Sequence, residues 1–233
     1  MSTQSGLPQQ RRLFLTRLNA GAASLAALTA GKVAFAQTKS AAPFEAARHE
    51  KDDWLSELPG KHRLVFDTTS YERLADAMLF ANNFIRVNQA DYGLKASDLA
   101  VVVVVRHRST PFGYSDAMWA KYGMPIATRA KVDDPKTKMP PKINIFNTAE
   151  YGDLLANRGG TLDALFKLGV QLAVCATSTR GYAAAIAQAT GGNADGINEE
   201  LVSNLLSKNA RMVPAGIVAV SRAQERGYTL VST

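Results

Sequence analysis

Residues Gly169 to Gly181 read GVQLAVCATSTRG and hold the only cysteine of the 233-residue chain, Cys175. Val170 to Val174 is a short apolar run that follows a glycine, which predicts a buried strand. Ala176 to Arg180 is rich in small hydroxylated residues, a composition typical of a turn that opens a helix. The sequence therefore predicts that Cys175 lies at the carboxyl end of a buried strand, just before a helix.

The predicted position of Cys175 has two interpretations. In an open α/β sheet, ligands bind at the carboxyl edge, and the first amides of the following helix favour an anion or a thiolate there. Free cysteine is also among the most buried residue types, so Cys175 can equally be a small apolar filler of the core. A single cysteine forms no internal disulfide, so both a reactive thiol and a structural one remain open.

The rest of the chain predicts an alternation of strands and helices. The predicted strands are Arg63–Asp67, Leu99–Val105, Arg211–Val213 and Tyr228–Val231, besides the one before Cys175. The predicted helices are Ser70–Asn88 with Thr69 as its cap, Thr161–Leu168, Thr179–Ala189, Ile197–Leu206 and Ala215–Arg226. Leu99–Val105 is apolar at every position, which is typical of a strand covered on both faces in a parallel sheet. The predicted fold is a three-layer α/β/α sandwich with a mostly parallel sheet.

One long segment between the predicted strands has a different composition. After a short helix through Met118 to Tyr122, the stretch from Met124 to Lys142 contains four prolines and many charges. This composition predicts an extended excursion over the surface. Ile143 to Thr148 then either forms a minor edge strand or lies along the fold.

The first 36 residues have the composition of an export signal. Arg11 and Arg12 form a twin-arginine pair before apolar residues, Leu18–Ala30 is a modest Ala/Leu/Gly run, and Ala34-Phe35-Ala36 fits a small-x-small cleavage site. We expect the twin-arginine translocase to carry the chain to the periplasm and the signal to be removed near Ala36. Residues 37–61 are then an extended N-terminal arm with one or two helical turns, and residues 62–233 form the α/β domain.

Composition argues against several function classes. The first 36 residues contain four cations and no acid, so their removal lowers the formal charge from +7 to +3, too little to predict a nucleic-acid partner. The three histidines are scattered and no cysteine pair exists, so no metal site is predicted. No glycine-rich phosphate loop is present, and no cofactor is predicted.

Three segments together carry a family resemblance. They are GVQLAVCATSTRG at 169–181, VVVVVRH at 101–107 and VPAGIVAVSRAQERGYTLV at 213–231. Their order and spacing resemble the DsrE/DsrF family of small sulfur-relay proteins, which includes the TusD-type subunits, over about residues 63–233. The resemblance implies that Cys175 takes up a persulfide and hands it to a partner protein, and that the chain assembles as a trimer or hexamer. Arg108 stands where the family pattern usually has a glycine.

The resemblance gives the neighbours of Cys175 a role in binding the sulfur donor. The residues that would steady the anion are Arg106, His107, Thr177, Ser178 and Arg180. Each also has a plainer interpretation: the hydroxyl residues as helix caps, His107 as a structural histidine and Arg180 as a solvated helix residue. The expected function is a periplasmic sulfur carrier or sulfurtransferase. The alternatives are a non-catalytic binding or assembly module in which Cys175 only packs, and a thiol that senses oxidants or captures a soft metal ion between subunits.

Overall fold

The structure is a computed structural model that describes residues 45–233. The expected signal peptide, its cleavage point near Ala36 and the first part of the expected arm lie outside the described residues. Within residues 45–233, no helix combines the length and the apolar character that a membrane span requires.

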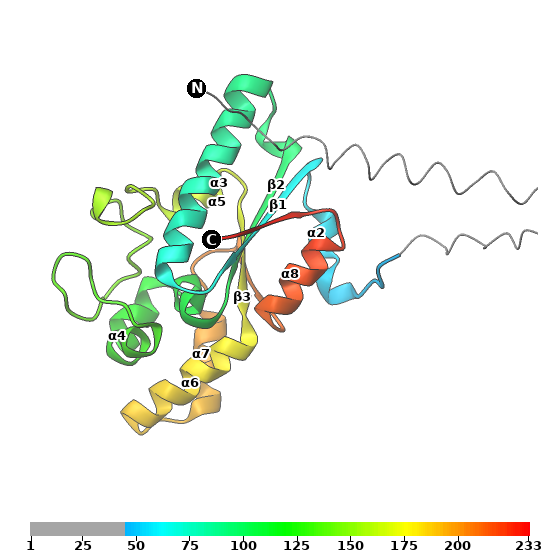
Figure 1. Ribbon diagram of the computed structural model, residues 1–233. Helices are drawn as coiled ribbons and strands as arrows, with labels where there is room; N and C mark the ends of the chain where they lie inside the picture. Colours follow the sequence, from blue (N-terminus) through cyan, green and yellow to red (C-terminus); the bar gives the residue numbers. More distant parts are fainter. Residues whose placement is uncertain (1–44) are drawn as a thin grey trace, which may run out of the picture. The chain divides into compact units, whose positions relative to one another are not determined.

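A parallel sheet forms the centre of the described chain (Figure 1). Its strands are β1 (His62–Thr68), β2 (Leu99–Val105), β3 (Gln171–Cys175), β4 (Ala210–Val213) and β5 (Thr229–Ser232). Their order is β4-β3-β2-β1-β5, and every neighbouring pair is parallel. The three-layer α/β/α fold predicted from the sequence is confirmed, with a sheet that is parallel throughout.

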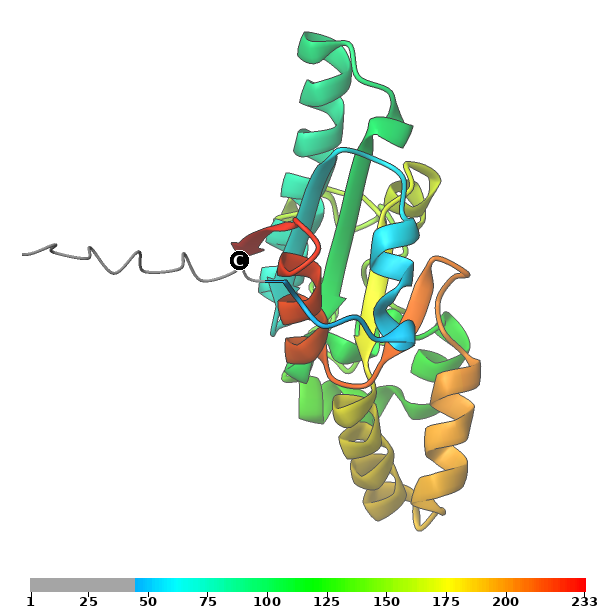
Figure 2. The same cartoon turned by 90° about the vertical axis from the view of Figure 1, so that its right-hand side faces the viewer.

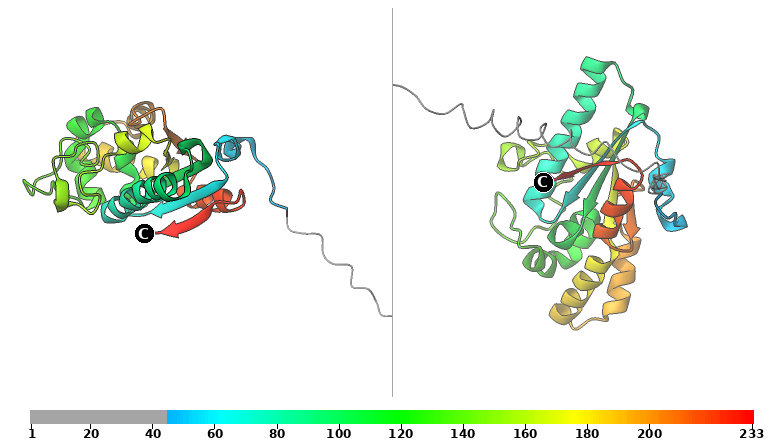
Figure 3. Two further views of the ribbon diagram at one scale, coloured as in Figure 1. Left: turned by 90° about the horizontal axis from the view of Figure 1, so that it is seen from above. Right: turned by 45° about the vertical axis from the view of Figure 1, so that its right-hand side comes forward.

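Helices cover both faces of the sheet (Figures 1 and 2). On one face lie α3 (Tyr71–Tyr92), α4 (Asp116–Ala130), α5 (Leu162–Lys167), α6 (Ala176–Thr190) and α7 (Ala194–Ser203). On the other face lie α8 (Gly216–Gln224) and the short α2 (Trp54–Glu57), which Figure 3 shows from two further directions. Four short 3₁₀ helices complete the elements of residues 45–233: η1 (Glu50–Asp52), η2 (Ala96–Asp98), η3 (His107–Gly113) and η4 (Gly152–Leu154).

Strand β2 contributes side chains to both hydrophobic layers. All seven of its residues are buried. Val101, Val103 and Val105 pack into the larger layer under α3 and α4, whereas Val102 and Val104 pack into the layer under α8. Burial of a valine side chain contributes about 1.5–3 kcal/mol, so this strand requires cover on both faces. Burial on both faces therefore explains why the strand is a near-continuous apolar run in the sequence.

The segment before β1 packs against the layer under α8. Trp54 and Leu55 are buried there. The carbonyl oxygen of Leu55 accepts hydrogen bonds from Arg63 Nη1 at 2.7 Å and from the Tyr228 hydroxyl at 2.8 Å. The guanidinium of Arg211 lies 4.4 Å from the centre of the Trp54 ring. These contacts attach the short helix α2 to the α/β domain.

Several helix starts differ from the sequence-based expectation because other side chains act as caps. Ser70, not Thr69, caps α3, and its hydroxyl accepts from the Arg73 amide. Helix α7 begins at Ala194, three residues before the predicted start, since the Asn193 side chain accepts from the Gly196 amide at 2.8 Å. Helix α6 begins directly after Cys175, so the turn expected there is already helical.

The largest difference lies in the segment predicted as an extended excursion. Helix α4 continues through Met124 to Ala130 and is broken only at Tyr122, where φ is −123° and ψ is 19°. This break places Pro125 in the first turn of a new helical segment, where the missing amide hydrogen is not needed. Ile126, Ala127 and Ala130 are buried, so the apolar face of this segment outweighs the proline.

Residues 143–148 follow the second of the two predicted alternatives. They form no strand but lie along the fold, with Ile145 and Phe146 fully buried. The Asn144 side chain donates hydrogen bonds to the carbonyl oxygens of Phe112 at 2.8 Å and Tyr114 at 3.2 Å. The connection is therefore held by side-chain hydrogen bonds and burial instead of by a strand ladder.

Substitution of Gly216 tests how closely α8 packs on β2. A methyl group at Gly216 would lie 2.6 Å from Arg106 Cβ and 3.2 Å from Val104 Cγ1. We expect Gly216→Ala to lower the free energy of unfolding by about 1–3 kcal/mol through overpacking, as measured by urea denaturation. The control is Gly196→Ala in α7, where the nearest atom is 3.6 Å away and helix propensity favours alanine by up to about 1 kcal/mol. Equal effects of the two substitutions would contradict the close packing.

Candidate functional site

The carboxyl ends of β3 and β4 are the point at which the chain connections diverge. The helix that follows β3, α6, lies on one face of the sheet, whereas the helix that follows β4, α8, lies on the other. In open α/β sheets this divergence leaves a crevice in which ligands bind. Cys175 is the last residue of β3 and is in register with Val213, the last residue of β4. The predicted position of Cys175 at this edge is confirmed.

Cys175 caps helix α6 through its sulfur. Its Sγ atom accepts a hydrogen bond from the Ser178 amide at 3.4 Å, and its carbonyl oxygen accepts one from Thr179 Oγ1 at 3.0 Å. The thiol is free, and the residue is 5% exposed. An amide donor at the amino end of a helix stabilises negative charge on the atom that it contacts. The sulfur therefore lies against an amide donor at a helix start, while little of it meets solvent.

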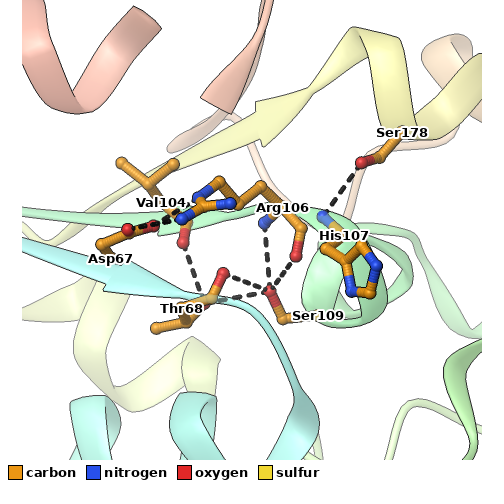
Figure 4. Close-up of polar contacts among 7 residues, drawn as sticks. All are labelled: Asp67, Thr68, Val104, Arg106, His107, Ser109 and Ser178. Atoms are coloured by element: carbon orange, nitrogen blue, oxygen red, sulfur yellow. Dashed lines mark hydrogen bonds and ion pairs between the residues drawn. The ribbon is translucent and has the colours of Figure 1, made fainter. Parts of the chain in front are cut away.

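Arg106 forms a two-pronged ion pair with Asp67 on the neighbouring strand β1 (Figure 4). Arg106 Nε donates to Asp67 Oδ1 at 2.7 Å, and Arg106 Nη2 donates to Asp67 Oδ2 at 2.8 Å. The hydrogen bond to Asp67 raises the pKa of Arg106, and negative charge on Cys175 would add to that effect. Arg106 is thus a fixed cation near the sulfur, directed at a carboxylate of its own chain.

The chain turns sharply after Arg106. The Ser109 hydroxyl, which is fully buried, accepts from the Arg106 amide at 3.0 Å and donates to the Thr68 carbonyl at 2.9 Å. His107 next adopts a left-handed conformation, with φ of 56°. Figure 4 shows the result: Arg106 points toward Asp67, while His107 points away from it, beside Ser178. Arg106 and His107 are adjacent in the chain, but their side chains therefore lie in different surroundings.

His107 and Ser178 line a cavity of about 420 Å³. The His107 amide donates to Ser178 Oγ at 2.9 Å. The lining residues are His107, Arg108, Arg129, Lys131, Ser178 and Tyr182, and Cys175 is not among them. Ser178 thus links the sulfur to the cavity: its amide donates to Cys175 Sγ, and the residue itself is part of the cavity lining.

Thr177 and Arg180 lie outside this cavity. Thr177 Oγ1 donates to the Pro214 carbonyl at 3.0 Å, which ties the start of α6 to the connection before α8. Arg180 Nη2 donates to Thr177 Oγ1 at 3.3 Å, and both side chains are exposed. The structure therefore brings Thr177, Ser178 and Cys175 together in the first turn of α6, and it directs the Arg180 side chain along the helix surface.

Four residues of this region were not predicted from the sequence. They are Asp67, Arg129, Lys131 and Tyr182. Arg129 and Lys131 belong to the stretch whose prolines suggested a surface excursion. For Arg129 and Lys131, the sequence signal that indicates a helix is the run of apolar residues around Ile126, which continues the helical spacing past Pro125.

Comparisons with protein-family models, with curated proteins and with solved structures found no match for this chain. Among residues 45–233, no group of three His, Cys, Asp or Glu side chains lies close enough together to hold a metal ion.

The Arg106–Asp67 pair gives a test of the site's construction. We expect Asp67→Asn to lower the free energy of unfolding by about 1–3 kcal/mol, because a charge-assisted, two-pronged contact at the sheet edge is lost. The matched control is Asp163→Asn, which breaks the exposed Asp163–Lys167 pair and should change stability by less than about 0.5 kcal/mol. A similar small change in both variants, measured by urea denaturation, would show that Asp67 does not hold Arg106 in place.

Proposed function

We propose that this protein is a DsrE-like sulfur carrier in which Cys175 accepts sulfane sulfur and passes it to a partner protein. The observation that carries the proposal is the hydrogen bond from the Ser178 amide to Cys175 Sγ at the carboxyl edge of the sheet. This amide and the nearby cation Arg106 would stabilise the negative charge of a persulfide on the one thiol of the chain.

The transfer step is balanced with thiosulfate as donor. The Cys175 thiolate attacks the sulfane sulfur, a new S–S bond forms, and the bond between the two donor sulfurs breaks. Sulfite leaves with the electron pair of the broken bond, and Cys175 carries a persulfide anion. The Ser178 amide and the first turn of α6 then face the negative charge of that persulfide.

The low exposure of Cys175 sets a condition on this chemistry. A donor must displace part of the surrounding side chains to reach a sulfur that is 5% exposed. Pro214 and the start of α8 border this edge, and a cavity of about 630 Å³ lies between the Arg48–Asp52 segment and Pro214, Val218 and Arg222. Local opening on that side is the route by which a partner would reach Cys175.

The proposal includes the compartment and the assembly that the sequence suggested. The twin-arginine pair at Arg11-Arg12 supports export by the twin-arginine translocase to the periplasm, with the signal removed near Ala36. The family resemblance supports a homo-oligomer, a trimer or hexamer, that meets a sulfur donor or acceptor protein.

The burial of Cys175 favours a second candidate function. In this alternative the protein is a binding or assembly module, and the sulfur serves only as the cap of α6 and as packing between β3 and β4. Arg106 then stabilises the sheet edge through Asp67 and has no part in chemistry.

Mass spectrometry of the intact protein distinguishes the two functions. We expect incubation of the full chain with thiosulfate or polysulfide to add one sulfur atom, about 32 Da, which is lost on reduction. The added sulfur should be absent in Cys175→Ala. Because the sulfur is nearly buried, a thiol reagent should label native Cys175 more slowly than the same residue in the urea-unfolded chain.

Lys208→Gln is the control for a general effect of surface charge, since it removes one charge from an exposed lysine before β4, at the sheet edge opposite Cys175. This variant should take up sulfur at the rate of the unchanged protein. If the folded protein gains no mass with either donor while Cys175 is labelled only after unfolding, the carrier function is excluded and the structural role of Cys175 remains.

A further inference from the structure

The cavity beside Ser178 is lined by positive charges that no carboxylate of the described residues neutralises. Arg108, Arg129 and Lys131 all line it, together with His107. Within residues 45–233, no ion pair joins any of these three cations to an Asp or Glu side chain. Surface cations are usually scattered and solvated, whereas these converge from two separate segments: η3 carries Arg108, and the end of α4 with its C-cap carries Arg129 and Lys131.

The guanidinium of Arg129 is held in place by packing. It lies over the Tyr182 ring, 5.2 Å from the ring centre. It also approaches α6 at Gly181, where a methyl group would lie 2.6 Å from Arg129 Nη2. Glycine at this position allows the close approach, and stacking on tyrosine orients the plane of the guanidinium. The side chain is therefore ordered, while its hydrogen-bond donors are not used within the described chain.

Arg108 approaches the same place from the loop after β2. Its main chain is fixed, because its amide donates to the Thr69 carbonyl at 3.0 Å. Its Nε atom is buried and has no hydrogen-bond partner among the described residues. Burial raises the pKa of the Tyr182 hydroxyl, and the positive charges of Arg129 and Arg108 oppose this rise. The charges of both guanidinium groups therefore act on the hydroxyl of Tyr182, which is part of the cavity lining.

We propose that this cavity binds a doubly charged tetrahedral oxyanion of the phosphate or sulfate class. Two guanidinium groups offer the paired donors that match oxyanion geometry, and Lys131 adds a third charge. A volume of about 420 Å³ exceeds that of one inorganic ion, so the oxyanion is accepted either free or as part of a small organic molecule. The inference does not depend on sulfur transfer at Cys175, which is not part of the cavity lining.

Calorimetric titration of the full chain at low ionic strength tests the site. The probes are inorganic phosphate, sulfate and ribose 5-phosphate, with sodium chloride of equal ionic strength as the blank. We expect saturable binding with a dissociation constant of about 1 mM or tighter, and at least tenfold weaker binding in Arg129→Gln and in Lys131→Gln. Tighter binding of ribose 5-phosphate than of both inorganic ions identifies the organic phosphate as the occupant, and the reverse order identifies the free ion.

The matched control is Lys208→Gln, which removes one charge from an exposed lysine outside the cavity and should leave binding unchanged. Chemical-shift changes on titration should centre on the Ser178 and Tyr182 amides. No saturable binding, or an equal loss in Lys208→Gln, overturns the proposal. Cys175→Ala should bind the oxyanion as the unchanged protein does, so failure of the anion site and failure of the carrier function are read separately.

Discussion

The burial of β2 on both faces is the constraint from which the rest of the architecture follows. A strand with no polar side chain among Leu99–Val105 is stable only between two hydrophobic layers. The helices α3 to α7 cover one face, and the chain must then return across the sheet through α8 to cover the other. That return makes the connections after β3 and β4 diverge, and Cys175 lies at the point of divergence. The position of the Cys175 thiol therefore follows from the way in which helices cover both faces of β2.

Much of this fold could be predicted because the relevant signals are local. The apolar runs, the cap at Thr161 and the glycine after α3 each act within a few residues, and the strands and most helices were predicted within a few residues of their positions. The extension of α4 could not be predicted in this way. The prolines of that stretch suggested an irregular chain, but the break at Tyr122 places Pro125 where a helix tolerates it, and burial of Ile126 favours the helix.

The site was predictable only in part, since its contacts join residues far apart in the chain. The position of Cys175 follows from one strand and one helix, so the sequence was sufficient. The Asp67–Arg106 pair joins residues on different strands, and the Arg129 contact with Tyr182 joins α4 to α6. Neither pairing has a signature in a single segment. The sequence likewise could not show that Arg106 and His107 separate, because that depends on the left-handed turn at His107.

The short helices that precede β1 affect where the domain can be shortened. Trp54 and Leu55 cover one end of the layer under α8, and the Leu55 carbonyl satisfies both Arg63 and the Tyr228 hydroxyl. A chain cut back to His62 would remove Trp54 and Leu55 from the layer that also contains Val65 and Ala100, and it would leave the buried Tyr228 hydroxyl without its acceptor. Trimming to the sheet alone therefore exposes apolar surface that favours aggregation, and a version that keeps both hydrophobic layers closed includes Trp54 and Leu55.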